Sequence, residues 1–291
     1  MNLLTVFTPT YNRKEKLKLL YRSLLHQTDK NFLWLIVDDG SSDGTCELVR
    51  QWIDEQRINI EYVYQDNGGK IRALAKGIES CVTPWMICVD SDDCVTEDAV
   101  ECMLADIDAF DDEESAGLIY PQWMINEPSP KWIPNTVESV SIMDIKHLYG
   151  IDETAILFRT EYLKKIEIPL FEGEKFLSEE VLYIRLAEFG EFVPHDRAFY
   201  LSEYQEDGMT NNLFRIWMKN PRGTICLLQS RYAYCGRYAL FSRVRNRVKC
   251  IMNFNAFCMA VGSSWYELTP SKIYSMLLYF PSILWKKIRF T

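Results

Sequence analysis

Short apolar runs that end in polar or acidic clusters organise the first 125 residues of the chain. Segments with apolar residues at helical spacing separate these runs. Strands that are apolar on both faces and alternate with helices are typical of a parallel sheet covered on both sides. We therefore predict an α/β fold with a mainly parallel central sheet flanked by helices and right-handed connections. The predicted strands are Leu3–Thr8, Phe32–Val37, Ile60–Tyr64, Trp85–Val89 and Gly117–Tyr120.

Helices are predicted between and after these strands. Ser42 or Asp43 can cap the second helix, because a short polar side chain accepts hydrogen bonds from the first free N–H groups. Residues 126–176 are rich in proline and are predicted to be irregular, with a hairpin and loops. From Leu213 onward the chain is predicted to be helical. The other predicted helices are Arg13–Gln27, Lys70–Ser80, Asp98–Phe110 and Ser178–Phe189.

Charge divides the chain of 291 residues into two parts. Residues 1–212 hold 19 basic and 40 acidic residues, whereas residues 213–291 hold 13 basic residues and one acid, Glu267. The net charge of −9 argues against an anionic partner only if charge is spread evenly. We therefore expect an acidic domain over 1–212 and a basic, aromatic, helical region over 213–291 that forms an interaction surface.

Cysteine and histidine spacing shows no disulfide or zinc framework. The nine cysteines form no CxxC pair, and His26, His147 and His195 have no paired metal-ligand spacing. We expect reduced thiols in a cytoplasmic protein. The longest candidate for a membrane span, Ile273–Trp285, is shorter than the roughly 18 apolar residues required. The first apolar run is also too short for a signal peptide.

Polar residues follow the carboxyl ends of the first four predicted strands, where open parallel sheets bind their ligands. A single aspartate at such a position is commonly a helix cap or a turn residue. Four such ends at one edge of a sheet favour a ligand site. The four clusters are Thr8–Arg13, Asp38 with Asp39, Asn67–Lys70, and Asp90–Asp93.

Asp90-Ser91-Asp92 suits a nucleoside diphosphate that is bound through a divalent cation. Carboxylates repel phosphates unless a hard cation lies between them, and Mg²⁺ or Mn²⁺ takes one or two carboxylates together with phosphate oxygens. Asp90 can instead accept hydrogen bonds from ribose hydroxyls. Asn67-Gly68-Gly69-Lys70 matches neither a Walker loop nor GxGxxG, so a dinucleotide fingerprint is excluded. Lys70 and Arg72 either meet a base or phosphate or begin a solvated helix.

Four motifs at these positions, FTPTYNR, VDDGSSDGT, NGGK and VDSDD, together resemble the family-2 glycosyltransferases of the GT-A fold. The resemblance covers residues 3–100. It implies a Rossmann-like GT-A domain and an inverting transfer of a sugar from a nucleotide diphosphate, most often UDP, to an acceptor hydroxyl. Residues 1–100 would then bind the nucleotide sugar, and residues 101–212 would supply the acceptor side and the base.

The resemblance also implies roles for individual residues. Tyr11 would stack on the base, and Asp39, in preference to Asp38, would bind it. Asp92, with Asp90, would hold Mn²⁺ or Mg²⁺. The full nucleotide-binding set is Thr8, Pro9, Tyr11, Arg13, Asp38, Asp39, Gly69, Lys70, Asp90 and Ser91.

An inverting transferase needs a general base for the acceptor hydroxyl. The resemblance places it in the acidic pair Glu179-Glu180, at the start of a predicted helix. Carboxylates at that position also complement the helix dipole, which is the structural alternative. We prefer Glu179 on the spacing of the following residues, and the choice between the two stays open.

Two later segments, Glu203–Thr210 and Asn220–Gly223, resemble capsule and cell-wall polysaccharide members of the family. They line the acceptor or diphosphate site, or else form a turn and a cap. The chain lacks a Gln-x-x-Arg-Trp motif, which argues against a processive synthase. We expect a glycan or polyprenyl-diphosphate-linked acceptor.

In residues 213–291, basic side chains are interleaved with aromatic and aliphatic ones. This pattern suits an interfacial helix on anionic lipid, so we expect a peripheral protein on the inner face of the cell membrane. Nucleic-acid binding is the disfavoured alternative, because the rest of the chain is acidic. A helical subdomain with internal aromatic packing and a homodimer interface stay open.

Two other functions are alternatives to the transfer of a sugar. A nucleotidyltransferase also combines an α/β sheet with metal and nucleotide, but usually carries a glycine-rich basic loop after the first strand. This chain has Pro-Thr-Tyr-Asn there. A catalytically inactive sugar-nucleotide binder or assembly partner is the alternative without enzymatic activity.

Overall fold

The computed structural model describes residues 2–110, 112, 114–125, 127–203 and 213–290. The chain forms two compact units, the first from residues 1–168 and 185–206, and the second from residues 169–184 and 207–291. Segment 169–184 therefore groups with the C-terminal helices, although it was predicted as part of the catalytic domain. The functional boundary predicted at residue 212 stays a prediction.

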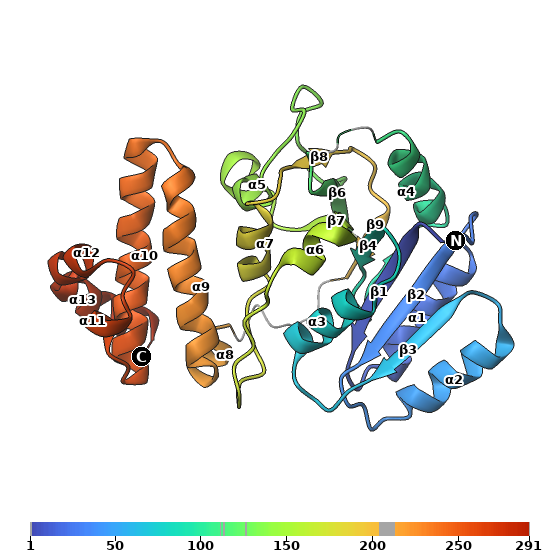
Figure 1. The fold of residues 1–291 in the computed structure, drawn as a ribbon, viewed down its shortest axis with the longest axis horizontal. Helices are drawn as coiled ribbons and strands as arrows, with labels where there is room; N and C mark the ends of the chain where they lie inside the picture. Colours follow the sequence, from blue (N-terminus) through green and yellow to red (C-terminus); the bar gives the residue numbers. More distant parts are fainter. Residues whose placement is uncertain (1, 111, 113, 126, 204–212, 291) are drawn as a thin grey trace. The chain divides into compact units, whose positions relative to one another are not determined.

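The first unit is built on a sheet in which neighbouring strands follow the order β3-β2-β1-β4-β7-β6-β9-β5, with β8 also paired to β6 (Figure 1). Strands β1 to β4 are parallel to one another, and β7 is antiparallel to both β4 and β6. The predicted mainly parallel α/β sheet is thus confirmed. The strands are β1 Leu4–Thr10, β2 Phe32–Asp38, β3 Ile60–Tyr64, β4 Trp85–Cys88, β5 Cys94–Val95, β6 Gly117–Met124, β7 Thr154–Arg159, β8 Phe192–Pro194 and β9 Tyr200–Ser202.

Alternation along β1 directs apolar side chains to both faces of the sheet. Leu4 and Val6 join a buried cluster with Leu17 of α1 and Val49 of α2. Phe7 points the other way and packs against Gly77 of α3. Helices therefore cover both faces, as predicted. The helices of this unit are α1 Lys14–Leu25, α2 Thr45–Glu55, α3 Lys70–Ser80, α4 Ala99–Asp108, α5 Ile142–Tyr149 and α6 Thr160–Lys165, while α7 Glu180–Leu186 spans both units.

The prediction of irregular structure over residues 126–176 is wrong in its centre. This segment contains α5, β7 and α6, and β7 is an inner strand of the sheet. Within β7, only Ala155–Phe158 is buried. A short apolar run after a proline-rich stretch carries little local signal, and β7 is specified by pairing with β4 on one side and β6 on the other.

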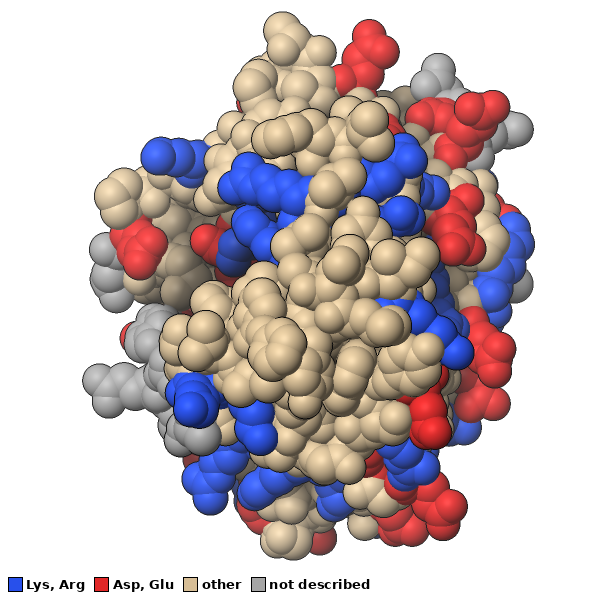
Figure 2. All heavy atoms as spheres, turned by 90° about the vertical axis from the view of Figure 1, so that its left-hand side faces the viewer, with Lys and Arg blue, Asp and Glu red and all other residues tan. Residues whose placement is uncertain are grey.

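The second unit is helical, as predicted for the chain after Leu213. Its aromatic residues pack partly inward: Phe257 of α10 contacts Trp217 and Phe290 edge to face. Figure 2 views this side of the molecule and shows Lys and Arg side chains around a broad area without charged residues. In the part of the chain that the structure describes, no helix is long and apolar enough to cross a membrane. The helices are α8 Leu213–Lys219, α9 Pro221–Tyr234, α10 Leu240–Val261, α11 Trp265–Leu268, α12 Lys272–Leu277 and α13 Tyr279–Arg289.

The close approach of α3 to β1 requires glycine at position 77. A Cβ there would lie 2.3 Å from Cε2 of Phe7, which is too close for any real contact. We expect Gly77→Ala to lower the free energy of unfolding by about 1–3 kcal/mol, because overpacking outweighs the gain in helix propensity. Urea unfolding measures the change. Glu79→Ala, on the exposed side of α3, is the control and should change stability by less than about 0.5 kcal/mol.

Candidate functional site

The ends of β1 and β2 are tied together by hydrogen bonds between their loops. The backbone N–H of Asn12 donates to Oγ of Ser41 at 2.8 Å, and the N–H of Ser42 donates to Oδ1 of Asn12 at 2.8 Å. Asn12 adopts a left-handed φ of 50°, which asparagine tolerates better than most residues. Asp43 then accepts from the N–H groups of Lys14 and Thr45, and so holds the starts of both α1 and α2.

Both carboxylates after β2 are buried and bonded to the protein. Asp38 accepts from the N–H of Ser41 at 2.8 Å and from the hydroxyl of Tyr62 at 2.7 Å. Burial of the phenol, together with its hydrogen bond to Asp38, raises the pKa of Tyr62 well above its usual value. Asp38 therefore fastens the loop after β2 to β3.

Asp39 organises the loop after β3. Its Oδ1 accepts from Nε2 of Gln65 at 2.6 Å and from the N–H of Gly68 at 2.8 Å. Its Oδ2 accepts from the N–H of Gly69 at 2.7 Å and from Nδ2 of Asn67 at 3.3 Å. These bonds fill the usual accepting capacity of a carboxylate. Contact between Asp39 and a nucleobase, which was predicted, would require exchange of one of these bonds.

Gly69 supplies the backbone conformation that brings α3 to the site. Its φ is 92°, in the region that glycine adopts without strain. The next residue, Lys70, begins α3 and directs Nζ to both oxygens of Asp90, at 2.8 and 2.9 Å. The loops after β3 and β4 therefore meet, as the sequence predicted.

Asp92 connects the loop after β4 to the start of α1. It forms an ion pair with Arg13, and Nζ of Lys16 lies 3.7 Å from the same carboxylate oxygen. Four strand ends thus converge at one edge through side-chain contacts. Arg13, Lys70, Asp90 and Asp92, all predicted site residues, lie in this network.

Tyr200 is a buried residue of the site that sequence reasoning missed. Its hydroxyl accepts from the N–H of Asp90 at 3.0 Å and donates to Oδ2 of Asp93 at 2.7 Å. Burial, with repulsion from Asp90 and Asp92, raises the pKa of Asp93 to about 7. Tyr200 lies in β9, more than a hundred residues after the aspartates, so no local pattern indicated it.

The remaining nucleotide-binding candidates differ in exposure. Tyr11 is 47% exposed, as a side chain that stacks on a base requires. Thr8 is fully buried, and its hydroxyl accepts from Nε1 of Trp34 at 3.0 Å, so it supports the core of the sheet. Pro9 and Ser91 are also buried. Thr10, which was not assigned a role, has a buried hydroxyl without a hydrogen-bond partner among the described residues.

The two candidate bases have different partners within the second unit. Glu180 forms a two-point ion pair with Arg231, in which Nε donates to Oε1 at 2.6 Å. Glu179 precedes α7 and accepts from the hydroxyl of Tyr183 at 3.1 Å. Arg231 also lies over the ring of Trp217. Glu180 is thus held by a cation from α9, and the choice between Glu179 and Glu180 as the proton acceptor stays a prediction.

Asn220–Gly223 forms a cap in this structure. Oδ1 of Asn220 accepts from the N–H of Lys175 at 2.9 Å. Glu174 accepts from the N–H groups of Arg222 and Gly223, both at 2.8 Å, at the beginning of α9. The segment therefore begins α9 and is capped by Glu174, whereas its alternative role of lining the acceptor or diphosphate site stays a prediction. Most of the other segment, Glu203–Thr210, lies outside the described residues.

A divalent cation fits the donor chemistry of Asp90 and Asp92. Both present carboxylate oxygens, the donors that Mg²⁺ and Mn²⁺ prefer, and one or two carboxylates suffice when phosphates complete the shell. Their repulsion of Asp93 shows that negative charge is crowded at this loop. No group of three or more His, Cys, Asp or Glu residues is arranged for a metal within the described residues.

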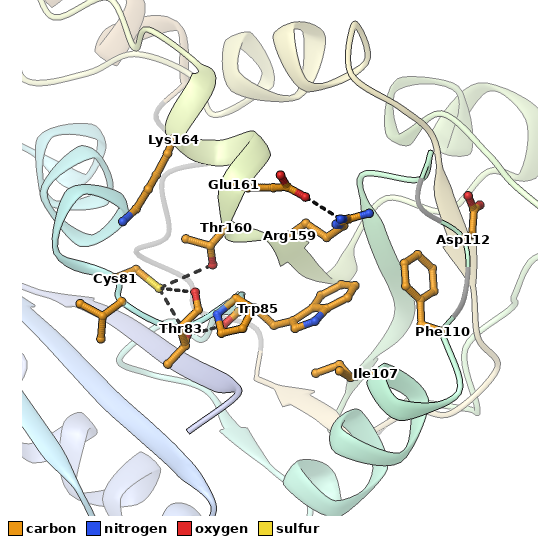
Figure 3. Close-up of a pocket in the computed structure, with 12 residues that line it drawn as sticks. Cys81, Thr83, Trp85, Ile107, Phe110, Asp112, Arg159, Thr160, Glu161 and Lys164 are labelled. Carbon is orange, nitrogen blue, oxygen red and sulfur yellow. Dashed lines mark hydrogen bonds and ion pairs between the residues drawn. The ribbon is translucent and has the colours of Figure 1, made fainter. Parts of the chain in front are cut away.

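A pocket of about 830 Å³ lies at the opposite end of the strands (Figure 3). It is lined by residues 81–84 before β4, by Trp85 at the start of β4, and by Arg159 at the end of β7. Trp85 pairs with Arg159 in the sheet, which places this pocket at the amino end of β4. The predicted site residues follow the carboxyl end and do not line this pocket.

Tyr200 provides a test of the site geometry. We expect Tyr200→Phe to lower the affinity for UDP and divalent cation about tenfold, because Asp90 and Asp93 lose their shared anchor. Isothermal titration calorimetry measures this. Tyr120→Phe is the matched control, because the hydroxyl of Tyr120 donates to Asp106 at 3.0 Å outside the site. Both variants should lose stability, but equal UDP affinity in both would contradict a positioning role for Tyr200.

Comparison with known proteins agrees with this geometry. The family model "Glycosyl transferase family 2" matches residues 5–166, more than half of the chain. Glycosyltransferase GlyA of Streptococcus pneumoniae serotype 4 is 31% identical over 241 residues, which are 83% of this chain and 32% of GlyA. The poly(ribitol-phosphate) beta-N-acetylglucosaminyltransferase TarS of Staphylococcus aureus is 25% identical over 218 residues, 69% of this chain and 36% of TarS. The chain thus spans about a third of the length of these relatives.

The fold is also found in a solved structure. The crystal structure of S. aureus TarS 1–349 in complex with UDP-GlcNAc has a TM-score of 0.62 and 17% sequence identity, and the match covers 100% of this chain and 89% of that one. This likeness confirms the predicted GT-A-type fold. The family match over residues 5–166 and the 31% identity with GlyA show that the chain belongs to glycosyl transferase family 2.

Proposed function

We propose that the chain is an inverting glycosyltransferase that moves a sugar from a UDP-sugar to a hydroxyl of a glycan or lipid-linked acceptor. The convergence of four strand ends on Asp90 and Asp92 is the observation that supports this most strongly. Ligands of open α/β sheets bind at this edge. The complex of TarS with UDP-GlcNAc supports uridine as the nucleoside of the donor.

The cations of the site suit a diphosphate. Arg13, Lys16 and Lys70 contact the aspartates in the described structure, where they neutralise Asp92 and Asp90. Binding of the donor would transfer these cations to phosphate oxygens, with which arginine forms two-point contacts. The exposed ring of Tyr11 then offers a stacking surface for the base.

Asp92, with Asp90, would hold Mn²⁺ or Mg²⁺ in this proposal. When bound, the ion neutralises charge that develops on the departing diphosphate. Asp93 and Tyr200 keep the loop in position, because the Tyr200 hydroxyl contacts both the backbone of Asp90 and the carboxylate of Asp93.

Glu179 is the proposed general base. Its carboxylate would take the proton of the acceptor hydroxyl while that oxygen attacks the anomeric carbon and the bond from carbon to diphosphate breaks. A single displacement of this kind inverts the configuration at that carbon. Glu180 would position the segment through its ion pair with Arg231.

The relatives and the charge of residues 213–291 support our proposal for the acceptor and the location. The name of TarS gives poly(ribitol phosphate) as its acceptor, which supports a polymeric acceptor and a role in surface polysaccharide synthesis. We place the enzyme at the cytoplasmic face of the cell membrane, where a polyprenyl-diphosphate-linked acceptor would be accessible. The basic residues 213–291 support contact with anionic lipid, rather than a homodimer interface.

Release of UDP from UDP-sugars tests the chemistry. We expect Glu179→Gln to lower kcat by about 10²–10⁴-fold, because the proton acceptor is lost. The control is Glu180→Gln, which should destabilise the protein through Arg231 and retain more activity. Loss of turnover in Glu180→Gln with full activity in Glu179→Gln would show that the base is Glu180. UDP binding without turnover in the wild type would instead indicate an inactive nucleotide binder.

Removal of divalent cations tests the metal proposal. Dialysis against EDTA should abolish UDP release, and Mn²⁺ or Mg²⁺ should restore it, because the ion offsets charge on the leaving diphosphate. Asp92→Asn should raise the metal concentration needed for half-maximal activity. Full activity in EDTA would show that Arg13, Lys16 and Lys70 suffice for diphosphate departure.

A further inference from the structure

Helices α12 and α13 bury small polar residues and expose large apolar ones. Ser275 and Ser282 are fully buried on the inner side of these helices. Nδ2 of the buried Asn255 in α10 donates to the carbonyl of Ser275 at 3.0 Å, and Oγ of Ser282 donates to the carbonyl of Leu278 at 2.7 Å. Both serines are therefore hydrogen-bonded within the unit, since the hydroxyl of Ser275 also bonds to that of Thr269, and the ring of Tyr279 packs beside that of Trp265.

The outer side of each helix carries exposed apolar residues, which together we call the outer row. Within each helix they are spaced by three or four positions, with Leu277 next to Met276, and so lie along one side of that helix. Each is 60–77% exposed, whereas an ordinary globular helix buries such residues. The outer row consists of Ile273, Met276, Leu277, Phe280, Leu284 and Ile288.

Polar contacts fix which side faces outward. Nε1 of Trp285 donates to Oδ1 of Asn253 in α10 at 2.8 Å, and Nζ of Lys286 donates to the carbonyl of Met259 at 3.0 Å. Arg289 also contacts Oδ1 of Asn253, at 2.9 Å. These bonds orient α13 against α10 and leave Leu284 and Ile288 on the outside. The exposure of the outer row is thus built into the packing of the unit.

The charge around the outer row indicates which kind of partner can bind it. Figure 2 shows this side of the molecule as an uncharged area bordered by Lys and Arg side chains. Lys272 and Lys287 are exposed on the same helices. Residues 213–291 contain 13 basic residues and one acid, so two copies of this face would repel each other. An anionic lipid surface supplies both the apolar layer and the opposite charge.

We propose that the outer row of α12 and α13 is a docking surface for an anionic lipid bilayer, with the two helices lying in the plane of the interface. The apolar side chains would enter the boundary between head groups and acyl chains, and the lysines would contact the head groups. Helices α12 and α13 have 6 and 11 residues, fewer than a bilayer span needs. This inference rests on the membrane location proposed above and identifies the face responsible for it.

Vesicle flotation of the full chain tests this proposal. We expect binding to vesicles of phosphatidylcholine mixed with phosphatidylglycerol, and weak binding to phosphatidylcholine alone. The double variant Leu277→Glu, Leu284→Glu should reduce the bound fraction about tenfold or more, because it places carboxylates in the apolar layer. The control is Leu148→Glu in α5, at a position that is 60% exposed in the first unit, which should bind like the wild type.

Two further measurements separate the possible failures. Size-exclusion chromatography with light scattering should give a monomer for wild type and double variant. A wild-type dimer that the double variant dissociates, or equal flotation of both proteins, would overturn the proposal. Lipid-free UDP release should be unchanged in the double variant. Flotation without UDP release would refute only the proposed chemistry, and UDP release without flotation would refute only the docking surface.

Discussion

Carboxylates hold together the loops at the carboxyl edge of the sheet, and the site depends on this constraint. Asp39 alone fixes the loop after β3, residues 65–69, through four hydrogen bonds. Asp90 and Asp92 bind cations from α3 and α1. Hydrogen bonds to charged groups contribute about 1.5–3 kcal/mol each, so the loops are positioned before any ligand arrives. In the proposed function, a diphosphate would bind by taking over cations that now contact the aspartates.

The sequence was most informative where structure is specified locally. Alternating apolar runs and helical segments predicted β1 to β4 and their helices, and the polar strand ends predicted a common edge. Strand β7 and Tyr200 were missed for one reason: both are defined by partners far away in the chain. The hydroxyl of Tyr200 bonds to the backbone of Asp90, 110 residues earlier in the chain, and the local periodicity of the sequence does not indicate such a contact. The partner of Glu180, Arg231, is 51 residues away and was equally inaccessible.

Composition identified the C-terminal region as basic and aromatic, but could not give the direction of its side chains. In the sequence, Ser275 and Ser282 only interrupt an apolar run. In the structure both serines are buried, and their hydroxyls bond to Thr269 and to the carbonyl of Leu278. Large apolar side chains on the outside of the same helices oppose the arrangement that water favours. Periodicity alone could not show this exposure, because the same spacing also fits an ordinary amphipathic helix that buries its apolar side.

The proposed base and the proposed lipid surface belong to the same unit. Segment 169–184 carries Glu179 and groups with the helices that follow residue 207. The ion pair of Glu180 with Arg231 fastens that segment to α9, and α9 packs against α10. The outer row is fixed to α10 in turn, through Trp285 and Lys286. A unit that rests on lipid through this row would therefore hold its base at a constant depth relative to a lipid-borne hydroxyl. The proposed nucleotide site lies in the other unit. Under these proposals, one unit positions the acceptor and the other binds the donor.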